Sequence, residues 1–527
     1  MRLSFSIHTL IAFHSRVRFQ SGSLPPLACA IAVAFAGPSF ARVLDATVAI
    51  STGDSLGPSA VSNLNTPFTD GAGRISFLGT LEDGQRFIWW DTSAVFFSND
   101  ALPFVLTGGE LSMGASDTGE FIYSPSVDGE DAVYTNGGPL LVAMQPIPSL
   151  PGRFSTFNSR PMMLPDGTSY WVSGSADTPK GGSTNRHLLR ATDPADSSTI
   201  SVVLSGGDVI EGKTIDPSAS NFDFWISDDG SHHIHVLDML ATPDIHVYLD
   251  GAFVAIEGGA TGQGTAWQSF DIVGVNDAGN YFFTGDTDGA TATDEFIAYN
   301  GAIVVQEGDT LDGTLLASGF ALRAAAINDL DQVAHVWGLS ANEHLFVGPG
   351  VDLRSSRNLL AVGDSVDVNG DEVADYQITD FNASTATGPG LDFAEDGYVW
   401  VEVDAVDLSD ASEHEIVVGV RVDETSSAPG IVTASSLRLR SSGPNPFTSA
   451  TRLECRLERT VRIDLALFDV EGRRVHTLYD GMAGPGVREF TWDGSTDRGT
   501  PVASGVYFAR LAIQGEPVQH QRIVRIR

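Results

Sequence analysis

The chain alternates apolar and polar residues over short runs, and each run follows a polar turn. The segment "TDGAGRISF" occupies residues 69–77, "VNDAGNYFF" occupies 275–283 and "INDLDQVA" occupies 327–334. Alternation with a period of two predicts a strand with one buried face, and Asn, Asp and Gly supply the positive φ that tight turns need. No stretch after the N-terminus has a clear helical period. The pattern therefore predicts an all-β protein.

The polar turn recurs seven times, at spacings of 46 to 66 residues. The seven turn positions are Gly73, Gly119, Gly167, Gly230, Gly279, Asp331 and Gly397. A second signal, a Gly-Asp pair, precedes several of the turns by 20 to 23 residues, as in "LSGGDVI" (204–210) and "VQEGDTL" (305–311). A fixed spacing inside a period of roughly 50 residues indicates a tandem repeat.

Repeats of this length, each holding about four short strands, are typical of the blades of a β-propeller. One blade cannot bury both faces of its sheet, whereas a ring of blades buries them. We therefore expect a β-propeller-like repeat domain of about seven blades over residues 42–425, with an array of β-sandwiches as the alternative. The repeat resembles that of secreted bacterial proteins with tandem N-x-x-G-x-x-x-F units. This resemblance implies a repeat architecture and export rather than a reaction.

Composition changes near residue 426. Residues 426–440 are rich in Ser, Ala, Pro and Gly, which is typical of a linker. The acidic excess of the chain, whose net charge is −37, lies before this linker, and the segment after it is rich in Arg. Short alternating runs separated by Gly- and Asp-rich turns then predict an immunoglobulin-like β-sandwich over 441–527.

Four motifs of this C-terminal segment occur in a specific order. They are "NPF" (445–447), "FDVEGR" (468–473), "WDG" (492–494) and "ASGVYF" (503–508). Together they resemble the FlgD-type Ig-like domains and the type A C-terminal sorting domains of secreted bacterial proteins. The resemblance implies that the segment engages a secretion machinery of type IX, or attaches the protein to the cell surface. A stabilising accessory domain is the alternative.

The N-terminus predicts a secretory signal peptide over residues 1–41. Arg2, Arg16 and Arg18 precede an apolar run at 27–36 that is too short to span a bilayer, and a small-x-small cleavage pattern ends at Ala41. A buried strand or a membrane anchor is the alternative. No later run approaches 18 apolar residues, so we expect a secreted or surface-attached mature chain without a transmembrane segment.

The net charge narrows the choice of partners. A surface this acidic argues against nucleic acid and anionic lipid. It is compatible with the binding of cations, although a solvated acidic surface that keeps an exported protein soluble explains it more simply.

The segment "DVNGDEVAD" (367–375) is the best candidate for a metal site. The expected oxygen donors, at loop positions 1, 3, 5, 7 and 9, are Asp367, Asn369, Asp371, the Val373 carbonyl and Asp375. This spacing collects oxygens around Ca²⁺, as in loops of the EF-hand, dockerin and thrombospondin type 3 kinds. The loop departs from them with Glu372 in place of the usual Gly and Ile378 in place of the bidentate Glu. Structural Ca²⁺ is the candidate cofactor, and an unoccupied acidic loop is the alternative.

Catalytic signatures such as G-x-S-x-G, H-E-x-x-H and the P-loop are missing. The leading hypothesis is a cell-surface or extracellular binding protein that recognises carbohydrate or protein on the propeller face. The alternatives are a secreted hydrolase or lyase acting on polysaccharide, and a structural surface-layer component. The tryptophans that are candidates for stacking on sugars are Trp89, Trp90, Trp171, Trp225 and Trp337. A deep channel with a close pair of acids and a His or Tyr favours an enzyme, and exposed aromatics favour binding.

Overall fold

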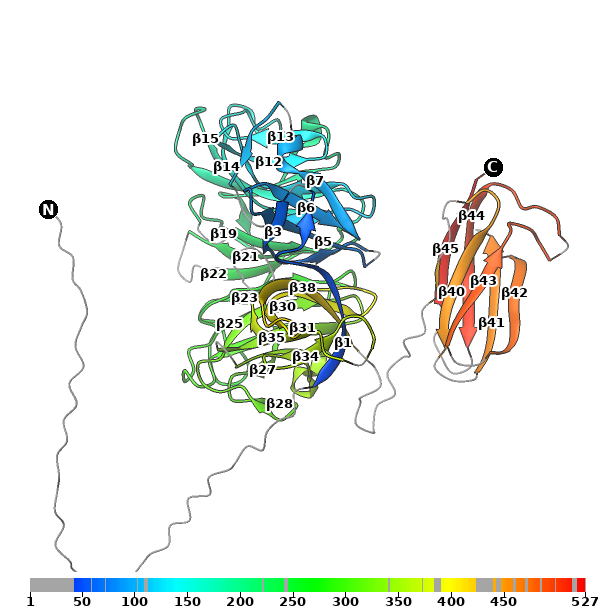
Figure 1. Ribbon diagram of the computed structural model, residues 1–527. Helices are drawn as coiled ribbons and strands as arrows, with labels where there is room; N and C mark the ends of the chain where they lie inside the picture. Colours follow the sequence, from blue (N-terminus) through cyan, green and yellow to red (C-terminus); the bar gives the residue numbers. More distant parts are fainter. Residues whose placement is uncertain are drawn as a thin grey trace, which may run out of the picture. The chain divides into compact units, whose positions relative to one another are not determined.

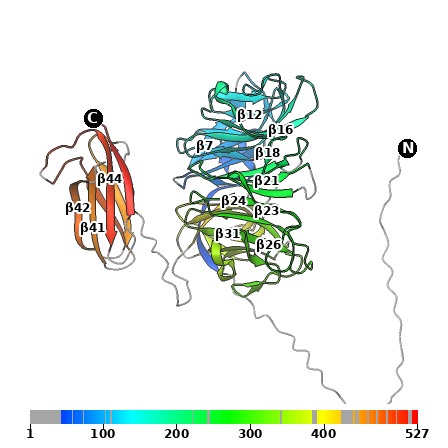
Figure 2. The same cartoon turned by 180° about the vertical axis from the view of Figure 1, so that it is seen from behind.

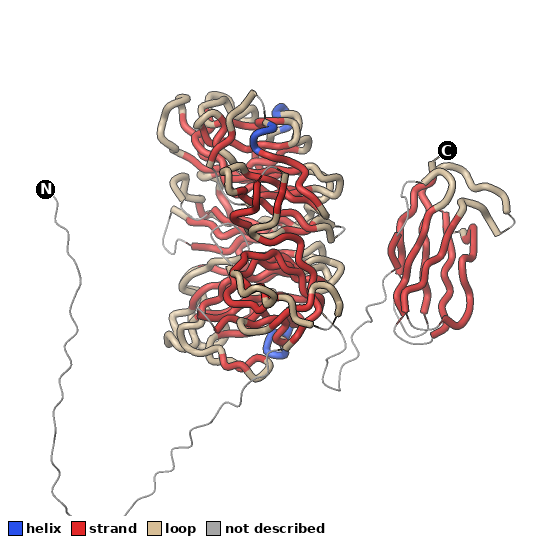
Figure 3. The backbone as a smooth tube through the Cα atoms, in the orientation of Figure 1, coloured by secondary structure: helices blue, strands red, loops and turns tan. Residues whose placement is uncertain are grey.

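The structure is a computed structural model that describes most of residues 42–526. The gaps are residues 58, 72, 102, 109–111, 220–221, 241–244, 340–341, 372, 383–389, 423–438, 442–446, 458–460, 470–472, 484–485, 498 and 514–518. The predicted signal peptide lies outside the described residues, and so does the predicted linker up to residue 438. The described chain consists mainly of short strands (Figure 3), with short 3₁₀ helices η1 (Ser98–Asp100), η2 (Ser197–Thr199) and η3 (Gly350–Ser355).

Between residues 43 and 421 the strands form seven blades of four antiparallel strands each (Figure 1). Blade 1 contains β4 (Phe68–Thr69), β5 (Ile75–Leu81), β6 (Arg86–Trp90) and β7 (Ser93–Phe97). Blade 2 contains β9 (Met113–Ala115), β10 (Phe121–Tyr123), β12 (Glu130–Thr135) and β13 (Gly138–Val142), and the short β8 (Leu106–Thr107) and β11 (Ser126–Val127) extend it. Blade 3 contains β14 (Phe154–Met163), β15 (Ser169–Ala176), β16 (Asn185–Ala191) and β17 (Ser201–Ser205).

Blades 4 to 7 repeat this order. Blade 4 contains β20 (Phe222–Ile226), β21 (His233–Asp238), β22 (Ile245–Leu249) and β23 (Ala252–Ile256). Blade 5 contains β24 (Val273–Val275), β25 (Tyr281–Asp286), β26 (Glu295–Tyr299) and β27 (Ala302–Gln306). Blade 6 contains β30 (Ala321–Ile327), β31 (Gln332–Leu339), β32 (Asn342–Pro349) and β33 (Arg357–Ala361). Blade 7 contains β36 (Leu391–Phe393), β37 (Tyr398–Asp407), β38 (Glu413–Arg421) and the N-terminal β1 (Val43–Ser51).

The ring is closed by its first strand. β1 pairs antiparallel with β38, with Ala46 opposite Val420, so that the start and the end of the propeller share one sheet. Both views show the blue N-terminal strand against the yellow strands of blade 7 (Figures 1 and 2). Closure covers edge strands that would otherwise be free to pair with other chains. The seven-bladed propeller predicted from the repeat is confirmed.

Short hairpins connect consecutive blades at four places. They are β2 (Ser55–Leu56) with β3 (Ser59–Leu64), β18 (Val209–Ile210) with β19 (Lys213–Thr214), β28 (Thr310–Leu311) with β29 (Thr314–Leu315), and β34 (Ser365–Asp367) with β35 (Tyr376–Phe381). The Gly-Asp pair of the repeat begins each hairpin. In one of them Gly308 has φ 86° and the Asp309 carboxylate accepts the backbone N–H of Gln306 at 3.0 Å. The motif therefore ends the outer strand of a blade and turns the chain toward the next blade.

The seven repeat turns lie between the first and second strands of the blades, and all seven positions have positive φ, from 58° to 89°. Glycine adopts this conformation without a steric penalty, and Asp331 is tolerated because Asp is enriched there. The Asn before the turn fixes its shape: Asn276 Oδ1 accepts the backbone N–H groups of Ala278 and Asn280 at 3.2 and 3.0 Å. The predicted turn chemistry is thus the one observed.

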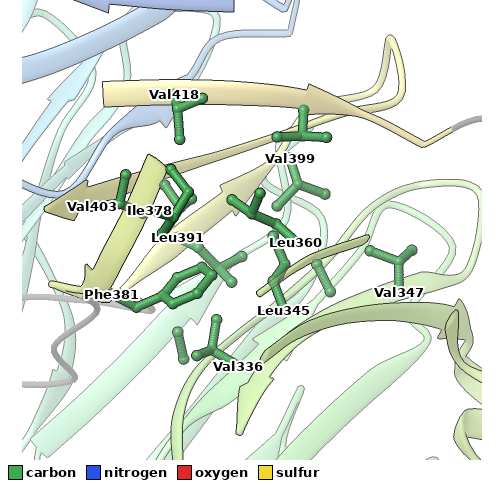
Figure 4. Close-up of a cluster of buried hydrophobic side chains, with 14 of the residues drawn as sticks. Val336, Leu345, Val347, Leu360, Ile378, Phe381, Leu391, Val399, Val403 and Val418 are labelled. Carbon is green, nitrogen blue, oxygen red and sulfur yellow. The ribbon is translucent and has the colours of Figure 1, made fainter. Parts of the chain in front are cut away.

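The hydrophobic core lies between the blades. Seven clusters of buried side chains each draw on two neighbouring blades, which together account for every interface of the ring. Between blades 6 and 7, for example, Val336 and Leu345 pack with Phe381 and Val399, all at most 1% exposed (Figure 4). Burying one such side chain contributes about 1.5–3 kcal/mol, so no blade is stable without its neighbours.

The C-terminal segment forms two further sheets. One has the order β39 (Leu439–Ser441), β40 (Thr451–Leu457), β43 (Gly486–Trp492), and the other has the order β42 (Arg474–Ala483), β41 (Val461–Asp469), β44 (Gly505–Ile513), β45 (Gln519–Arg525). Leu453 and Trp492 of the first sheet pack against Leu465 and Leu511 of the second. Tyr507 donates its hydroxyl hydrogen to the Ala503 carbonyl at 2.8 Å, as the tyrosine corner of Ig-like sandwiches does. The predicted β-sandwich is confirmed.

Candidate functional site

A hollow at the centre of the propeller is lined by residues of all seven blades, and we call it the axial hollow. Its polar lining residues are Thr69, Asp70, Asp228, Asn276, Asp329, Asp392 and Glu395. Its larger apolar lining residues are Phe68, Met113, Met162, Met163, Trp225, Val275, Ile327 and Phe393. The cavity volume is about 60 Å³. That space holds a few water molecules or the end of one side chain.

Two of the carboxylates in the wall are bound by the wall itself. The Asp70 carboxylate forms an ion pair with the Arg74 guanidinium, and Oδ2 lies 2.7 Å from Nε. Asp392 accepts hydrogen bonds from the backbone and hydroxyl of Thr69, the latter at 2.7 Å, and from the backbone N–H of Phe393 at 2.9 Å. These two groups are therefore held in place by residues of blades 1 and 7.

Asp228 differs from both. Asp228 is an exposed residue, and no described residue donates a hydrogen bond to its carboxylate. Burial raises the pKa of Asp228 well above its ordinary value, and the negative charges of Asp392, Asp277, Asp329 and Glu395 raise it further. The side chain nevertheless faces the open space of the hollow, where it is accessible to solvent. Blade 4 thus places in the hollow a carboxylate that accepts no hydrogen bond from a described residue.

Backbone N–H groups in the turns of blades 4 to 6 donate to acids in the turns of the next blades, and we call this series of hydrogen bonds the ladder. The backbone N–H of Asp229 donates to Asp277 at 2.9 Å, that of Asp277 donates to Asp329 at 2.9 Å, and that of Asp329 donates to Glu395 at 2.6 Å. Each turn of blades 4 to 6 therefore bonds to an acid in the turn of the next blade. This ladder gives the Asp after the Asn in the turns of blades 5 and 6 a role that the sequence alone did not indicate.

The predicted calcium loop lies elsewhere, in the turn between β34 and β35. One repeat unit, from Gly363 to Gly397, is longer than the others, and its extra length lies in the hairpin that leads from blade 6 to blade 7. Asp367 Oδ1 accepts the backbone N–H groups of Asn369 and Gly370 at 3.0 and 2.7 Å. The amide of Asn369 donates to Asp375 at 3.1 Å.

The loop thus brings Asp367, Asn369 and Asp375 into one turn. Asp371 accepts the backbone N–H of Val373 at 2.9 Å within the same loop. Among the described residues, no three His, Cys, Asp or Glu side chains gather as a set of metal ligands. Calcium at this loop stays a prediction.

The five candidate tryptophans have different surroundings. Trp171 and Trp337 are fully buried, and Trp89 is 8% exposed. The Arg74 guanidinium lies 5.0 Å from the centre of the Trp90 ring and covers it. Trp225, which is partly exposed, lines the axial hollow. Of the five, Trp225 is therefore the one placed to contact a ligand in the hollow.

A third repeated feature escaped the sequence analysis. A Glu near the start of the third strand of a blade accepts a backbone N–H from the next blade: Glu295 from Leu322 at 2.6 Å, and Glu415 from Leu64 at 3.0 Å. Glu343 accepts the backbone N–H of Phe381, which follows blade 6, at 3.0 Å. Burial raises the pKa of Glu295 to about 7. The second strands differ in length, so these residues have no constant spacing from the turns, and the signal in the sequence is weak.

Comparisons with known proteins give structural likeness at low identity. No protein-family model matches the sequence, and no curated protein sequence matches it either. PorZ, an essential bacterial surface component of the type-IX secretion system of Porphyromonas gingivalis, is 13% identical, with 90% of this chain and 60% of PorZ covered and a TM-score of 0.37. The β-propeller domain of the Trilobed protease from Pyrococcus furiosus is 12% identical, with 67% and 97% covered and a TM-score of 0.37.

The WD40 propeller domain of Doa1 is 11% identical, with 72% of this chain and 98% of that domain covered and a TM-score of 0.34. The architecture of this chain rests on its own strand pairing rather than on these likenesses. None of the helices in the part of the chain that the structure describes has the length and apolar character of a membrane span.

Proposed function

We propose that this chain is an exported cell-surface or extracellular binding protein that takes its ligand in the axial hollow. The observation that carries the proposal is Asp228, an acid to which no described residue donates a hydrogen bond, in a hollow that residues of all seven blades line. Ionisation of a carboxyl group among other acids destabilises the folded state. Such a cost is typical of functional sites, where a ligand offsets it.

The lining favours binding over catalysis. The described residues that line the hollow include acids from several blades but neither a His nor a Tyr. A secreted hydrolase or lyase acting on polysaccharide remains the second candidate, because acids of different blades face one space. A purely structural surface-layer role gives no reason for an uncompensated acid in a hollow.

Export and attachment form the second half of the proposal. The N-terminal segment 1–41 has the features of a cleaved leader, and the motifs of 441–527 resemble those of sorting domains. We propose that the C-terminal sandwich engages the secretion machinery or attaches the protein to the cell surface. The propeller then remains as the part that meets a carbohydrate or protein ligand outside the cell.

The test uses the mature chain, residues 42–527, on glycan and peptide arrays. The double variant Asp228→Asn/Asp329→Asn keeps the size and one acceptor oxygen of each side chain, replaces the other oxygen with an amide donor, and removes two charges from the hollow. We expect ligands whose signal falls at least tenfold in this variant. If every array signal is the same for the variant and the wild type, the hollow is not the binding site and the proposal is wrong.

A further inference from the structure

Building on the proposed function, we infer that the ligand of the axial hollow is the side chain of a lysine or arginine that a partner protein presents. The aliphatic stem would lie against the methionines and Trp225, and the cationic head would lie among the acids. The chemistry of the wall supports this choice over a neutral sugar at three points.

The first point is charge. Asp228, Asp329, Asp392 and Glu395 come from three blades and line one space, and no Lys or Arg is among the described lining residues. Arg74, which is not among the lining residues, donates to Asp70 and to the Asp117 carbonyl. The described lining of the hollow therefore carries acids and no basic side chain. A cation that enters is attracted by the negative charge of these acids.

The second point is the supply of hydrogen-bond donors. The Asn276 amide donates to the Asn328 carbonyl and to Asp331 at 3.1 and 2.8 Å. The Thr69 hydroxyl donates to Asp392 at 2.7 Å. The hydroxyl and amide donors of the lining are thus committed within the wall, whereas Asp228 accepts from no described residue. A ligand for this wall must bring donors, as an ammonium or guanidinium group does.

The third point is the apolar part of the lining. Met113 and Met162, which come from blades 2 and 3, and Trp225 from blade 4 line the same hollow as the acids. Methionine adapts its shape to flexible chains, and an aromatic face attracts cations. A methylene stem that ends in a positive charge uses both parts of the wall. A bare metal ion would use the acids alone.

The test titrates labelled peptides of the form Gly-Ser-X-Ser-Gly into the mature chain at 150 mM salt (roughly physiological ionic strength) and follows fluorescence anisotropy. X is Lys, Arg, acetyl-lysine or Gln. We expect the Lys and Arg peptides to bind at least tenfold more tightly than the acetyl-lysine and Gln peptides. The double variant Asp228→Asn/Asp329→Asn should lower the affinity for the Lys and Arg peptides at least tenfold.

A matched control separates the hollow from the general acidity of the chain. Asp83→Asn/Asp100→Asn removes two charges from exposed positions of blade 1 and its following loop, and it should change peptide affinity less than twofold. An equal loss of peptide affinity in both double variants would mean that the peptides are attracted by the general negative charge of the chain, and it would overturn the inference. So would equal binding of Gln and Lys peptides, or no binding of Lys and Arg peptides up to millimolar concentration.

The outcomes also separate this inference from the proposed function. Glycans whose array signal depends on Asp228 and Asp329, without a preference for Lys or Arg peptides, would keep the hollow as a binding site and overturn the cationic ligand. If millimolar CaCl₂ stabilises the wild type but not the hollow variant, and no peptide binds, the hollow is a metal site instead. If no probe distinguishes the hollow variant from the wild type, both proposals fall.

Discussion

At the scale of the residue, Asp228 connects the stability of the propeller with the proposed binding site. Its carboxylate lies among other acids of the axial hollow, and burial together with the charges of Asp392, Asp277, Asp329 and Glu395 raises its pKa. A pKa raised in the folded state means that ionisation destabilises the fold. At and above neutral pH the folded protein therefore carries a penalty that a neutral side chain would remove.

We expect Asp228→Asn to raise the Tm at pH 8 by a few degrees, because Asn has nearly the same shape and no charge. At pH 3 the carboxyl group is protonated in both states, so the difference should disappear. Differential scanning calorimetry of both proteins measures this, with Asp83→Asn as the control for an acid outside the hollow. A lower Tm at pH 8 would contradict the account of Asp228.

Glu402 gives a second prediction at the residue scale. It is 7% exposed, and burial, followed by the charge of Glu415, raises its pKa to about 8. Because the folded state binds a proton between pH 8 and about 4.5 that the unfolded state does not bind, stability should rise as the pH falls through 8. Glu295, whose pKa is raised to about 7, should likewise make stability rise as the pH falls through 7.

Buried histidines oppose this trend at lower pH. Burial lowers the pKa of His187 to about 4 and that of His335 to about 3, so the unfolded state gains protons below about 6.5 that the folded state does not. The Tm should therefore rise from pH 9 to about 6.5 and then level off. Glu402→Gln, which keeps an acceptor for the Asn382 amide, should flatten the rise, and exposed Glu413→Gln should not. A Tm that is independent of pH between 6.5 and 9 would refute this account.

At the scale of the element, the repeat turns were the most predictable feature. Positive φ is nearly restricted to Gly, Asn and Asp, so the sequence reveals each turn before any packing is known. The inter-blade bonds of Glu295 and Glu415 were not predictable in this way. Any third strand tolerates a Glu at its start, and only the neighbouring blade gives it a buried N–H to accept.

Gly397 allows the turn account to be tested without a steric clash. It has φ 87°, and an added Cβ would meet nothing within 4 Å. Gly397→Ala should lower the free energy of unfolding by about 1–2 kcal/mol through backbone strain alone. Gly182→Ala, at an exposed site with equal space and no positive φ, should be neutral. Equal effects of the two substitutions in urea denaturation would argue against the predicted strain.

The loop of residues 367–375 is tested by its response to calcium. If it holds Ca²⁺, millimolar calcium should raise the Tm above its value in EDTA by several degrees, as binding to the folded state alone requires. Asp367→Ala/Asp371→Ala should abolish that increment. Because Asp367 also accepts two backbone N–H groups, the variant will start from a lower Tm, so the increments rather than the absolute values are compared. An increment that survives in the variant would place calcium elsewhere.

At the scale of the whole molecule, the propeller depends on β1 for closure. Leader cleavage after Ala41 would leave this strand intact, since β1 begins at Val43. If the chain is exported as proposed, we expect the mature protein to begin at Arg42, which N-terminal sequencing can check. Removal of residues 42–51 should open the ring between blades 7 and 1, lower the Tm strongly and broaden the transition. A sharp transition at the original Tm would show that closure does not depend on β1.

The axial hollow was beyond the reach of the sequence. Its lining comes from seven distant places, and residues such as Met113, Met162 and Asp228 are ordinary where they occur in the chain. The repeat predicts the ring, but only the assembled ring shows which residue of each blade meets the axis. Trp225 was the one lining residue already considered for ligand contact, and nothing local distinguished it from the four other tryptophans.

The most direct test of the account locates the ligand on the protein. A Gly-Ser-Lys-Ser-Gly peptide with a photoreactive diazirine beside the lysine is irradiated with the mature chain, and mass spectrometry maps the cross-links. The account predicts cross-links near Met113, Met162 and Trp225 that disappear in Asp228→Asn/Asp329→Asn. Cross-links spread over the outer strands, and equal in the variant, would contradict the axial hollow as the binding site.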